Sequence, residues 1–586
     1  MNSFFIINFI ACCLVTALAT NFIKKYENRL ICFSLMAIYI ASIFPLFQGA
    51  LPIGHDQGYH LNRIAGITSA LKAGYFPVRI SPGWFDGFGY GISIFYPDIF
   101  LYFPAILYAE GIPLHVTMLF YMSGISLLTV ISSWFCFTKI TNNILLGILG
   151  SALYSLSAYR LACVYTRSAV GEYTAMIFYP LVMYGIYCIY AKSNNVQKKI
   201  SGWFFLPLGI SGLLSCHILS TIIVVIVLAI LFLLLWKISF QRITIILLLK
   251  SILLTTALSL WIIIPFITML PEITSGQIGW MWATPEKMQN NGLSIPDIFS
   301  FFANQNLPIS IGWPTLFGSI LYVWLKFIKC EKFNNELPST IIFYLFLLCL
   351  LMCTRVFPWS AIAWDSTVLS KIIGNIQFPW RFLGITSILG VLLTLWSINN
   401  NFTPFKRKTW SFLILLTLIF STTSYYDLSV RDMALSVDED RISPRRIAMP
   451  NTEYAPKNNY VNTRKKDLQF SEGIHVKSWT QQDLSLTLSC ENEDNRGYIR
   501  LPRYFYTGYH CRVNGSDLEL KTKSFFGRLT IEIPPHFKGT VTIDFIVPLL
   551  WRISEIISLI TILLVSFILF KKRIFPLNFQ HTKDNL

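Results

Sequence analysis

An aspartate, a histidine and an arginine are spaced so that one face of a helix can hold all three. Asp56, His60 and Arg63 stand at positions i, i+4 and i+7, which lie on the same side of an α-helix. A carboxylate, an imidazole and a guanidinium held together suit proton abstraction beside an anion. The alternative is that Asp56 only caps a helix while His60 and Arg63 are solvated. Both interpretations stay open on this segment alone.

The surrounding residues predict the helix that would present these groups. Asp56 is a residue type that favours helix starts, and Gly74 and Pro77 signal the end, so we expect a helix that runs to about Ala73. An apolar face opposite the three groups indicates a helix lying at the membrane–water boundary. That face would consist of Leu61, Ile64, Ala65 and Leu71.

Further polar side chains stand at the outer ends of apolar segments. Charges at membrane depth are costly and usually line a cavity, so we interpret Arg381 and Glu172 as functional rather than as a structural ion pair. His217 is either a hydrogen-bond donor between helices or a ligand contact. Glu272 is a second candidate for a catalytic carboxylate. The remaining candidates for substrate contacts are His55, Tyr59 and Arg167.

A segment rich in glycine and aromatic residues, 82–98, follows Arg79. Aromatic faces can stack on sugar rings, but aromatic residues at this depth also form an interfacial belt, which is the interpretation we favour for most of them. The Gly-x-Gly spacing lacks the βαβ context of a nucleotide site. No Cys or His spacing resembles a zinc site.

The composition excludes a water-soluble globular enzyme. Of the 586 residues, 54% are hydrophobic and 13% are charged, with a mean hydropathy of +0.55, whereas soluble domains carry about 25% charged residues. We therefore expect an α-helical polytopic membrane protein with about thirteen transmembrane helices. The expected spans are approximately 3–22, 30–49, 112–137, 144–158, 173–191, 202–216, 218–236, 243–264, 311–328, 339–355, 380–397, 409–425 and 547–570.

The formal net charge of +17 is concentrated in short breaks between these apolar segments. Lys and Arg favour cytoplasmic loops, so the pattern predicts an exterior N-terminus, a cytoplasmic C-terminus and no nucleic-acid partner. The expected exterior loops are 50–111, 159–172, 265–310 and 356–379. Basic groups occur, for example, at Lys24-Lys25, Lys198-Lys199, Lys406-Arg407-Lys408 and Lys571-Lys572-Arg573.

Three domains follow from this pattern. Residues 1–426 form the transmembrane domain, 427–546 an exterior β-rich domain, and 547–586 a final transmembrane helix with a basic cytoplasmic tail. Period-two alternation at 484–489, 528–533 and 540–545 predicts strands of a small sandwich. The aromatic and basic stretch 501–506 consists either of core aromatic residues with one solvated Arg or of a ligand-facing patch. Cys490 and Cys511, alone in the exported domain, are predicted to form a disulfide.

Several motifs resemble a family of bacterial membrane proteins. They are His-Asp-x-x-Tyr-His from His55, Gly-Tyr-Phe-Pro-x-Arg from Gly74, Gly-Tyr-Gly with Phe-Tyr-Pro from Gly89, and Gln-Phe-Pro-Trp-Arg-Phe from Gln377. Leu-Pro-Arg-Tyr-Phe-Tyr-Thr-Gly-Tyr-His with Val-Asn-Gly resembles the outer β-domain of the same family. This is the family known as "6-pyruvoyl-tetrahydropterin synthase-related", which is similar to YfhO-type proteins and belongs with the GT-C glycosyltransferases. The pterin label implies nothing here, because no matching soluble domain or zinc motif is present.

The resemblance implies a GT-C-like fold and transfer of a sugar from a polyprenyl-phosphate donor to an extracytoplasmic acceptor. An acidic residue of the first outer loop acts as the base in such enzymes, and this role falls on Asp56. We expect an inverting reaction in which His60 orients the base or the acceptor, and Arg63, Arg79 and Arg381 bind the donor phosphate. We expect no metal and no cofactor.

This interpretation places the protein in the bacterial cytoplasmic (inner) membrane, among membrane lipids, in the assembly or modification of envelope glycans. The acceptor is a glycan, a lipid or a protein. Two alternatives remain: a transporter or flippase of lipid-linked glycans, and a non-catalytic envelope-assembly protein. An enzyme should place Asp56 at a cavity mouth open to lipid and to the exterior, whereas a transporter should place its charges near mid-membrane.

Overall fold

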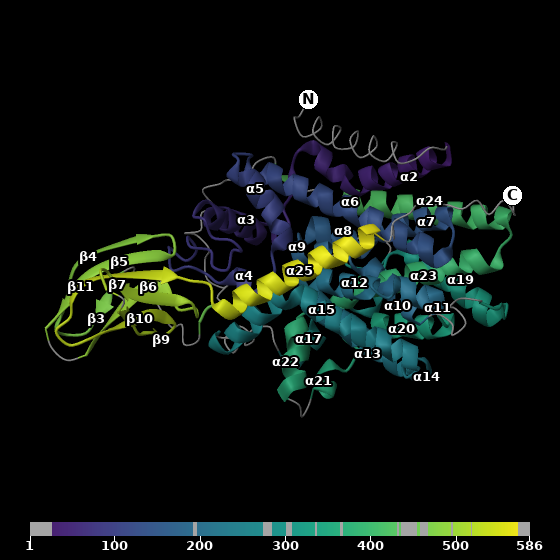
Figure 1. The fold of residues 1–586 in the computed structure, drawn as a ribbon. Coiled ribbons are helices and arrows are strands. Elements are labelled where there is room, and N and C mark those ends of the chain that lie inside the picture. Colours follow the sequence, from purple (N-terminus) through teal and green to yellow (C-terminus); the bar gives the residue numbers. More distant parts are fainter. Residues whose placement is uncertain are drawn as a thin grey trace.

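The protein consists of a large helical body and a β-domain that projects from one end of it (Figure 1). The computed structural model describes residues 26–190, 196–273, 284–300, 308–333, 337–363, 367–430, 433–434, 454–456, 467–493, 496–516 and 518–571. The first expected span, 3–22, lies outside these ranges. Most other expected apolar segments form helices.

The helical body is built from long apolar helices joined by short helical turns. The longer helices are α2 (Tyr26–Ile43), α3 (Gln57–Lys72), α6 (Leu114–Thr141), α7 (Ile144–Ser155), α10 (Tyr179–Ile189), α12 (Phe205–Leu214), α13 (Ile218–Leu234), α15 (Arg242–Met269), α19 (Trp313–Val323), α20 (Ser339–Met352), α22 (Thr367–Ile376), α23 (Leu383–Asn401), α24 (Pro404–Ser429) and α25 (Leu549–Lys571). The shorter elements are η1 (Phe44–Gln48), α4 (Ile92–Phe95), η2 (Ile99–Leu101), α5 (Tyr102–Ala109), α8 (Ala158–Leu161), η3 (Ala162–Thr166), α9 (Val170–Ala175), α11 (Val196–Gly202), α14 (Trp236–Ser239), η4 (Leu270–Glu272), α17 (Pro285–Asn290), α18 (Ile295–Ile298), η5 (Trp324–Ile328), α21 (Trp359–Ile362) and η6 (Pro379–Phe382).

Five helical stretches in the described ranges are long and apolar enough to cross a membrane. They are Arg29–Gln48, Leu114–Thr141, Arg242–Glu272, Pro379–Asn399 and Leu549–Lys571. The pair Ile144–Ser155 and Ala158–Thr166, bent by 46°, makes a sixth if it counts as one span. The expected number of about thirteen spans is not confirmed. Several other expected spans form helices of 10–17 residues, whereas about 20 residues are needed to cross a bilayer.

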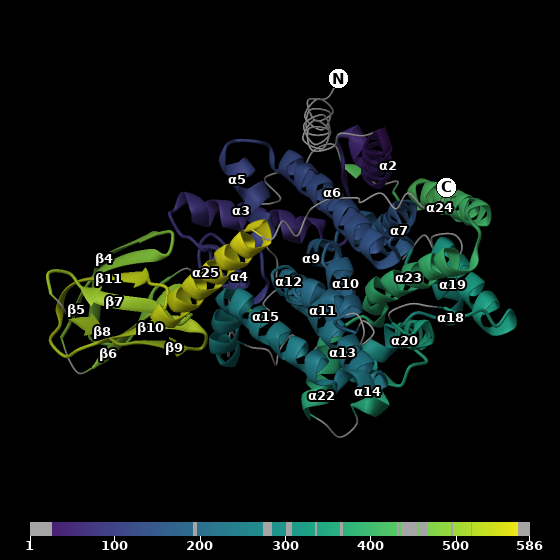
Figure 2. The same ribbon diagram turned by 45° about the vertical axis from the view of Figure 1, so that its right-hand side comes forward.

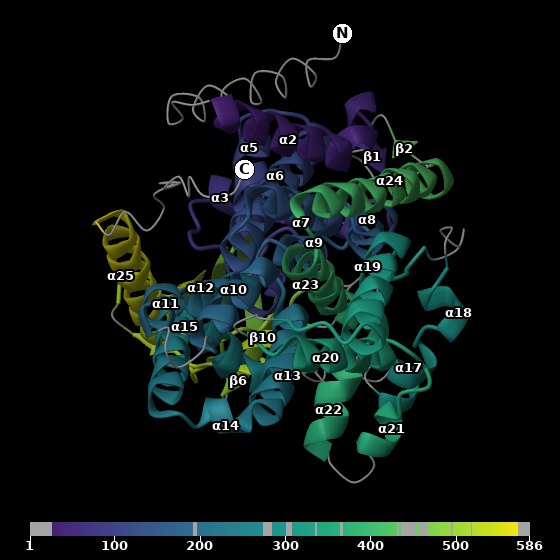
Figure 3. The same cartoon turned by 90° about the vertical axis from the view of Figure 1, so that its right-hand side faces the viewer.

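Burial separates the centre of the helical body from its rim. The most apolar window of Pro379–Asn399 is 94% buried, because α23 packs against α19, α20 and α7. The corresponding window of α25 is 11% buried. This helix contacts α15 along its length and lies at the edge of the bundle in the end-on view (Figure 3). An apolar helix with so little protein around it is suited to contact with lipid.

The β-domain contains two antiparallel sheets packed face to face. One has the order β3-β6-β10-β9 and the other β4-β5-β11-β7-β8, and inward-facing side chains of both, such as Leu488 and Ile531, share one core. The strands are β3 (Gln469–Phe470), β4 (Ile474–Gln482), β5 (Ser485–Asn492), β6 (Gly497–Tyr504), β7 (Tyr509–Val513), β8 (Glu519–Leu520), β9 (Thr522–Phe525), β10 (Arg528–Ile533) and β11 (Lys538–Phe545). The strands expected at 484–489, 528–533 and 540–545 are confirmed. A separate pair, β1 (Leu51–Pro52) and β2 (Met433–Ala434), joins the first outer loop to the segment after α24.

The predicted Cys490–Cys511 disulfide is wrong. Both cysteines are buried free thiols. Cys490 pairs with Gly539 and Cys511 with Ile543 on opposite edges of β11. They are therefore separated by roughly 10 Å across the sheet and roughly 13 Å along it, whereas a disulfide needs Cα atoms within about 7 Å.

The glycine- and aromatic-rich segment forms the junction between the two parts of the molecule. Phe85, Phe88 and Tyr90 are buried in the same core as the β-domain strands. The Tyr504 N–H donates to the Phe88 carbonyl at 2.9 Å. In the stretch 501–506, Arg503 is 1% exposed and donates to a backbone carbonyl. The core interpretation is therefore confirmed for the aromatic residues of that stretch, but the expected solvation of Arg503 is wrong, because the domain buries it. Segment 82–91 mainly docks the β-domain.

Candidate active site

Asp56 lies at the start of α3, as its sequence position predicts. The helix runs from Gln57 to Lys72, with Asp56 as its N-cap residue, but the Asp56 side chain makes no capping hydrogen bond. Asp56 is exposed, and within the described part of the chain its carboxylate has no hydrogen-bond or ion-pair partner. The carboxylate is therefore free to meet a substrate.

The segment 166–168 fixes the position of Asp56 through the backbone. The Asp56 N–H donates to the Arg167 carbonyl at 2.9 Å. Two residues earlier, a Cβ on Gly54 would lie 2.0 Å from the Ser168 Oγ, so only glycine fits there. Ser168 itself adopts a left-handed backbone with φ of 51°. Close packing of these loops brings the carboxylate beside the buried charges of residues 159–172.

Those buried charges form a compact group, which we call the charge cluster: Tyr159, Arg167, Glu172 and Arg381. The Arg167 Nη1 donates to Glu172 Oε2 at 2.8 Å, and Arg381 Nε lies 3.6 Å from the same oxygen. The Tyr159 hydroxyl donates to the other oxygen, Oε1. All four residues are buried. One carboxylate thus faces two guanidinium groups, so the cluster has an excess of positive charge.

Electrostatics tie Asp56 to this cluster. Partial burial raises the pKa of Asp56, and the charges of Arg167 and Arg381 lower it, with a net rise above the usual range. Asp56 is therefore exposed to solvent, while the protein around it still partly desolvates the carboxylate. Burial also raises the pKa of Glu172, but Arg167 and Arg381 outweigh this and hold it at about 2. Glu172 is therefore a permanent anion, and Asp56 is the better proton acceptor.

Arg381 occupies the turn that starts the most deeply buried span. It lies in η6, after Pro379, and its Nη1 donates to the Ile376 carbonyl at 2.7 Å and to Gln377 Oε1 at 3.1 Å. Gln377 has a φ of 66°, which turns the chain sharply before the span. The turn fixes the guanidinium against Glu172, so Arg381 and Asp56 share one neighbourhood.

His60 and Arg63 are not on a solvated face. Both are 2% exposed, because α3 packs its polar side onto the segment that leads into η2. Arg63 Nη2 donates to the Tyr96 and Pro97 carbonyls at 2.8 and 3.2 Å, and its guanidinium lies 3.9 Å from the centre of the Tyr96 ring. Burial, Arg63 and His217 lower the pKa of His60, so its imidazole is neutral. Solvation of the two side chains is thereby excluded.

Two further site residues, Tyr96 and Asp98, were not predicted from the sequence. The Tyr96 ring lies 5.9 Å from His60 and 6.0 Å from His217. A Cβ on Gly171 would lie 2.4 Å from the Tyr96 hydroxyl, so glycine at 171 admits it next to Glu172. Asp98 is 4% exposed, and burial raises its pKa to about 6 although Arg63 lowers it. The spacing of these residues gave no signal, because both stand in an aromatic segment typical of a membrane belt.

The other predicted site residues lie around or away from this group. Arg79 is bound elsewhere: its Nη2 lies 2.7 Å from Glu555 Oε1 on α25 and donates to the Trp261 carbonyl at 3.0 Å. Glu272 is exposed in η4, where α15 meets the β-domain. His55 is exposed beside Asp56, and the Tyr59 ring packs on His60 at 5.3 Å. The structure therefore gathers Asp56, Arg167, Glu172, Arg381 and His217, but not Arg79 or Glu272.

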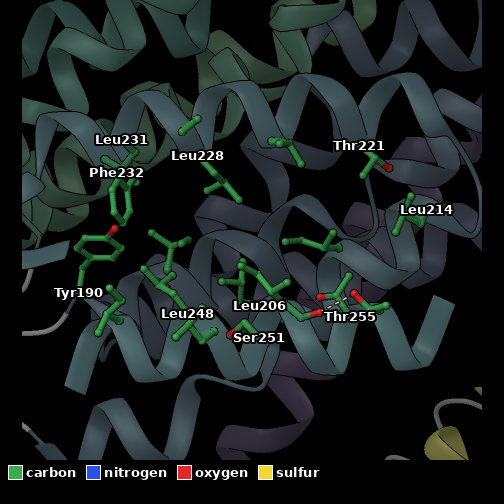
Figure 4. Close-up of a pocket in the computed structure, with 18 of the residues that line it drawn as sticks. Tyr190, Leu206, Leu214, Thr221, Leu228, Leu231, Phe232, Leu248, Ser251 and Thr255 are labelled. Atoms are coloured by element: carbon green, nitrogen blue, oxygen red, sulfur yellow. Dashed lines mark hydrogen bonds between the residues drawn. The ribbon is translucent and has the colours of Figure 1, made fainter. Parts of the chain in front are cut away.

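An apolar cavity of about 800 Å³ opens among α10, α12, α13 and α15. Leu214 and Thr221 line one end, and Tyr190 and Phe232 line the other (Figure 4). His217 lies between this cavity and the charge cluster, close enough to Glu172 to lower the pKa of that carboxyl. Its ring caps α13 by accepting the Ser220 N–H at 3.2 Å, between the two residues that line the first end. From Thr221 to Phe232 the cavity follows α13 for roughly 16 Å, enough for an extended hydrocarbon chain.

The chain shows limited similarity to known proteins. No protein-family profile matches the chain. An uncharacterized protein of Lactococcus lactis subsp. cremoris (strain MG1363) is 25% identical over 205 residues, which are 34% of this chain and 32% of that protein. Among solved structures, the arabinofuranosyltransferase AftD from Mycobacteria is similar over 71% of this chain and 28% of AftD, at 12% identity and a TM-score of 0.43. The chain thus spans about a third of its curated relative and just over a quarter of AftD.

Proposed function

We propose that the protein is a GT-C-type membrane glycosyltransferase that moves a sugar from a polyprenyl-phosphate donor to an extracytoplasmic acceptor in the assembly or modification of envelope glycans. One observation carries this proposal: an exposed carboxylate, without a side-chain partner among the described residues, borders a buried cationic cluster, and an apolar cavity begins close to His217, which lies beside that cluster. A polyprenyl-phosphate sugar has an anionic head and a long apolar tail. The anionic head suits the charge cluster, and the apolar tail suits the cavity.

The reaction assigned to this arrangement is an inverting displacement. Asp56 takes the proton of the acceptor hydroxyl, whose oxygen attacks the anomeric carbon of the donor sugar. The bond from that carbon to the phosphate oxygen breaks, and the lipid phosphate leaves with the electron pair. Attack opposite the leaving group inverts the anomeric centre, and a carboxylate within reach of the hydroxyl is a competent base.

Arg381 and Arg167 stabilise the leaving phosphate in this scheme. Negative charge grows on the phosphate as the glycosidic bond breaks, and preorganised, buried guanidinium groups stabilise that charge. Glu172 acts as a positioning residue, because it holds both arginines without being able to accept a proton at neutral pH. The Tyr96 hydroxyl lies next to Gly171, beside Glu172, and its ring packs near His60.

Transport of a lipid-linked glycan is the competing function. A transporter should hold its charges near mid-membrane. Here Arg381 stands at the first turn of its span rather than in the middle, and Asp56 lies in a loop before α3. These positions favour chemistry at the membrane boundary.

A structure of the protein with a bound polyprenyl phosphate tests the proposal. We expect the phosphate within hydrogen-bond distance of Arg381 or Arg167 and the tail between α13 and α15. A lipid whose phosphate lies at the opposite end of the cavity, near Tyr190, would contradict it.

A further inference from the structure

The outer face of the β3-β6-β10-β9 sheet carries an exposed aromatic group that plays no part in docking the domain. Tyr498, Phe525 and Phe526 are 41%, 40% and 52% exposed. On β6, Ile499 and Leu501 point into the core, so the alternation along the strand turns Tyr498 and Arg500 outward. The domain projects away from the helical body (Figures 1 and 2), which leaves this face accessible.

A guanidinium group lies among the three rings. Arg500 stands 4.2 Å from the centre of Phe525, 5.8 Å from Phe526 and 5.9 Å from Tyr498. Its Nη1 donates to Gln469 Oε1 at 2.7 Å, whereas its buried Nε has no hydrogen-bond partner among the described residues. In this part of the chain the cation is thus held in place by ring faces and one amide, and no described carboxylate pairs with it.

One of these rings belongs to a residue whose backbone conformation is unfavourable. Phe526 and Gly527 form the turn of the β9–β10 hairpin, with φ of 49° and 73°. Such turns favour Asn or Gly at the first central position, and a phenylalanine with positive φ is strained. About half of this ring is exposed, and its described contacts are with Phe525 and Arg500 rather than with the core of the domain.

The charge of the face is positive. Lys523, Lys521 and Arg496 all lower the pKa of Glu532, which is paired with Lys523. Arg528 lies close to Arg500 and to Asp467, so five cations of this region face two carboxylates. Ring faces attract the C–H groups of a sugar, and the unbalanced cations attract an anion. A ligand that has both features is a sugar chain bearing carboxylate or phosphate groups.

We propose that this face, defined by Tyr498, Arg500, Phe525 and Phe526, binds an anionic glycan of the cell envelope. Binding here does not require the transfer chemistry assigned to Asp56. If the chemistry is correct, the face holds a polymer near the exterior end of the helical body, where it is within reach as an acceptor or as an anchoring chain.

The test uses the full-length protein in detergent micelles with fluorescently labelled oligogalacturonate as an anionic glycan, and labelled dextran as a neutral one. We expect saturable binding of oligogalacturonate that weakens with salt, and at least about tenfold weaker binding by R500Q and by F525A. Trp479 on the opposite sheet is 39% exposed, so W479A is the matched control and should bind like the wild type.

Separate outcomes distinguish the possible occupants. Absence of oligogalacturonate binding, equal binding by R500Q, or stronger binding of dextran would overturn the proposal. So would binding of phosphatidylglycerol vesicles through this face without binding of the glycan, because the occupant would then be a lipid surface. If F525A fails to fold, Y498A replaces it. D56N should bind the glycan normally, so failure of the proposed transfer reaction would leave this result intact.

Discussion

Replacing Glu172 with glutamine removes the carboxylate that holds two buried guanidinium groups in place. Glu172 is 2% exposed and lies 2.8 Å from Arg167 and 3.6 Å from Arg381. The amide keeps the shape of the side chain but leaves both cations uncompensated. Breaking a buried pair in this way typically costs about 3–5 kcal/mol.

The pKa of Glu172 gives a second estimate of this cost. A shift from 4.5 to about 2 favours the ionised form by about 3 kcal/mol at neutral pH. Because the pKa is lowered in the folded state, this stabilisation is present above pH 4.5 and disappears as the pH falls from 4.5 towards 2. Glu172→Gln should therefore lose most stability near pH 7 and little near pH 2.

Unfolding of purified protein in mixed micelles, followed by tryptophan fluorescence across SDS fractions, measures the change. The matched control is Glu110→Gln, an exposed carboxylate of the same outer region, which should stay within about 0.5 kcal/mol of the wild type. Adding Arg167→Gln to Glu172→Gln should recover part of the loss, because one uncompensated cation is removed. A Glu172→Gln protein as stable as the wild type at pH 7 would refute the reasoning.

Three other substitutions test separate parts of the arrangement. Arg381→Lys keeps the charge but loses the planar guanidinium fork, so donor binding should weaken by about tenfold or more in a lipid-binding assay, and unchanged affinity would argue against a phosphate contact. Leu228→Trp fills the apolar cavity beside α13 and should raise the KM for a long-chain donor more than for a short-chain analogue. An equal effect on both KM values would show that the cavity does not bind the donor tail. Glu555→Gln leaves Arg79 buried without its 2.7 Å partner and should lower the free energy of unfolding by about 3 kcal/mol. The KM for the donor should stay unchanged. A rise in that KM without a loss of stability would indicate that Arg79 contacts the donor phosphate.

Local pattern was enough to predict the elements that carry the site. The helix expected from Asp56 to about Ala73 matches α3, because helix starts and stops depend on nearby residues such as Gly74. The strands of the β-domain were predicted for the same reason, since alternation along one strand records which face is buried. The grouping of these elements depends on contacts between distant segments.

The environment of His60 and Arg63 shows where local pattern fails. Their spacing places them on one face, as predicted, but that face is covered by Tyr96 and Pro97, which follow more than thirty residues later. A polar stripe on a helix does not reveal whether water or protein lies over it. The cysteine prediction failed similarly, because strand order, rather than strand content, keeps Cys490 and Cys511 apart.

The expected number of spans is not confirmed by the lengths of the described helices. The apolar stretches 202–216 and 339–355 were predicted to be spans, but the helices that they contain, α12 and α20, are short. An apolar composition is typical both of helices in contact with lipid and of helices buried in protein, so it does not distinguish them. Three members of the charge cluster, Arg167, Glu172 and Arg381, were predicted because charges in apolar surroundings are costly, whereas Tyr159 was not predicted. Arg79, predicted to bind the donor phosphate with Arg381, lies in a separate ion pair with Glu555.

The envelope glycans of a deletion strain that carries Asp56→Asn test the central claim most directly. Asparagine fits the same N-cap position, and no side-chain capping bond is lost, so the protein should fold and reach the membrane at the wild-type level, which immunoblotting checks. Because an amide cannot take a proton from a hydroxyl, transfer should fall by about 100-fold or more. We predict that the strain shows the glycan profile of the deletion, while Glu110→Gln restores the wild-type profile. Full restoration by Asp56→Asn would contradict the assignment of Asp56 as the catalytic base.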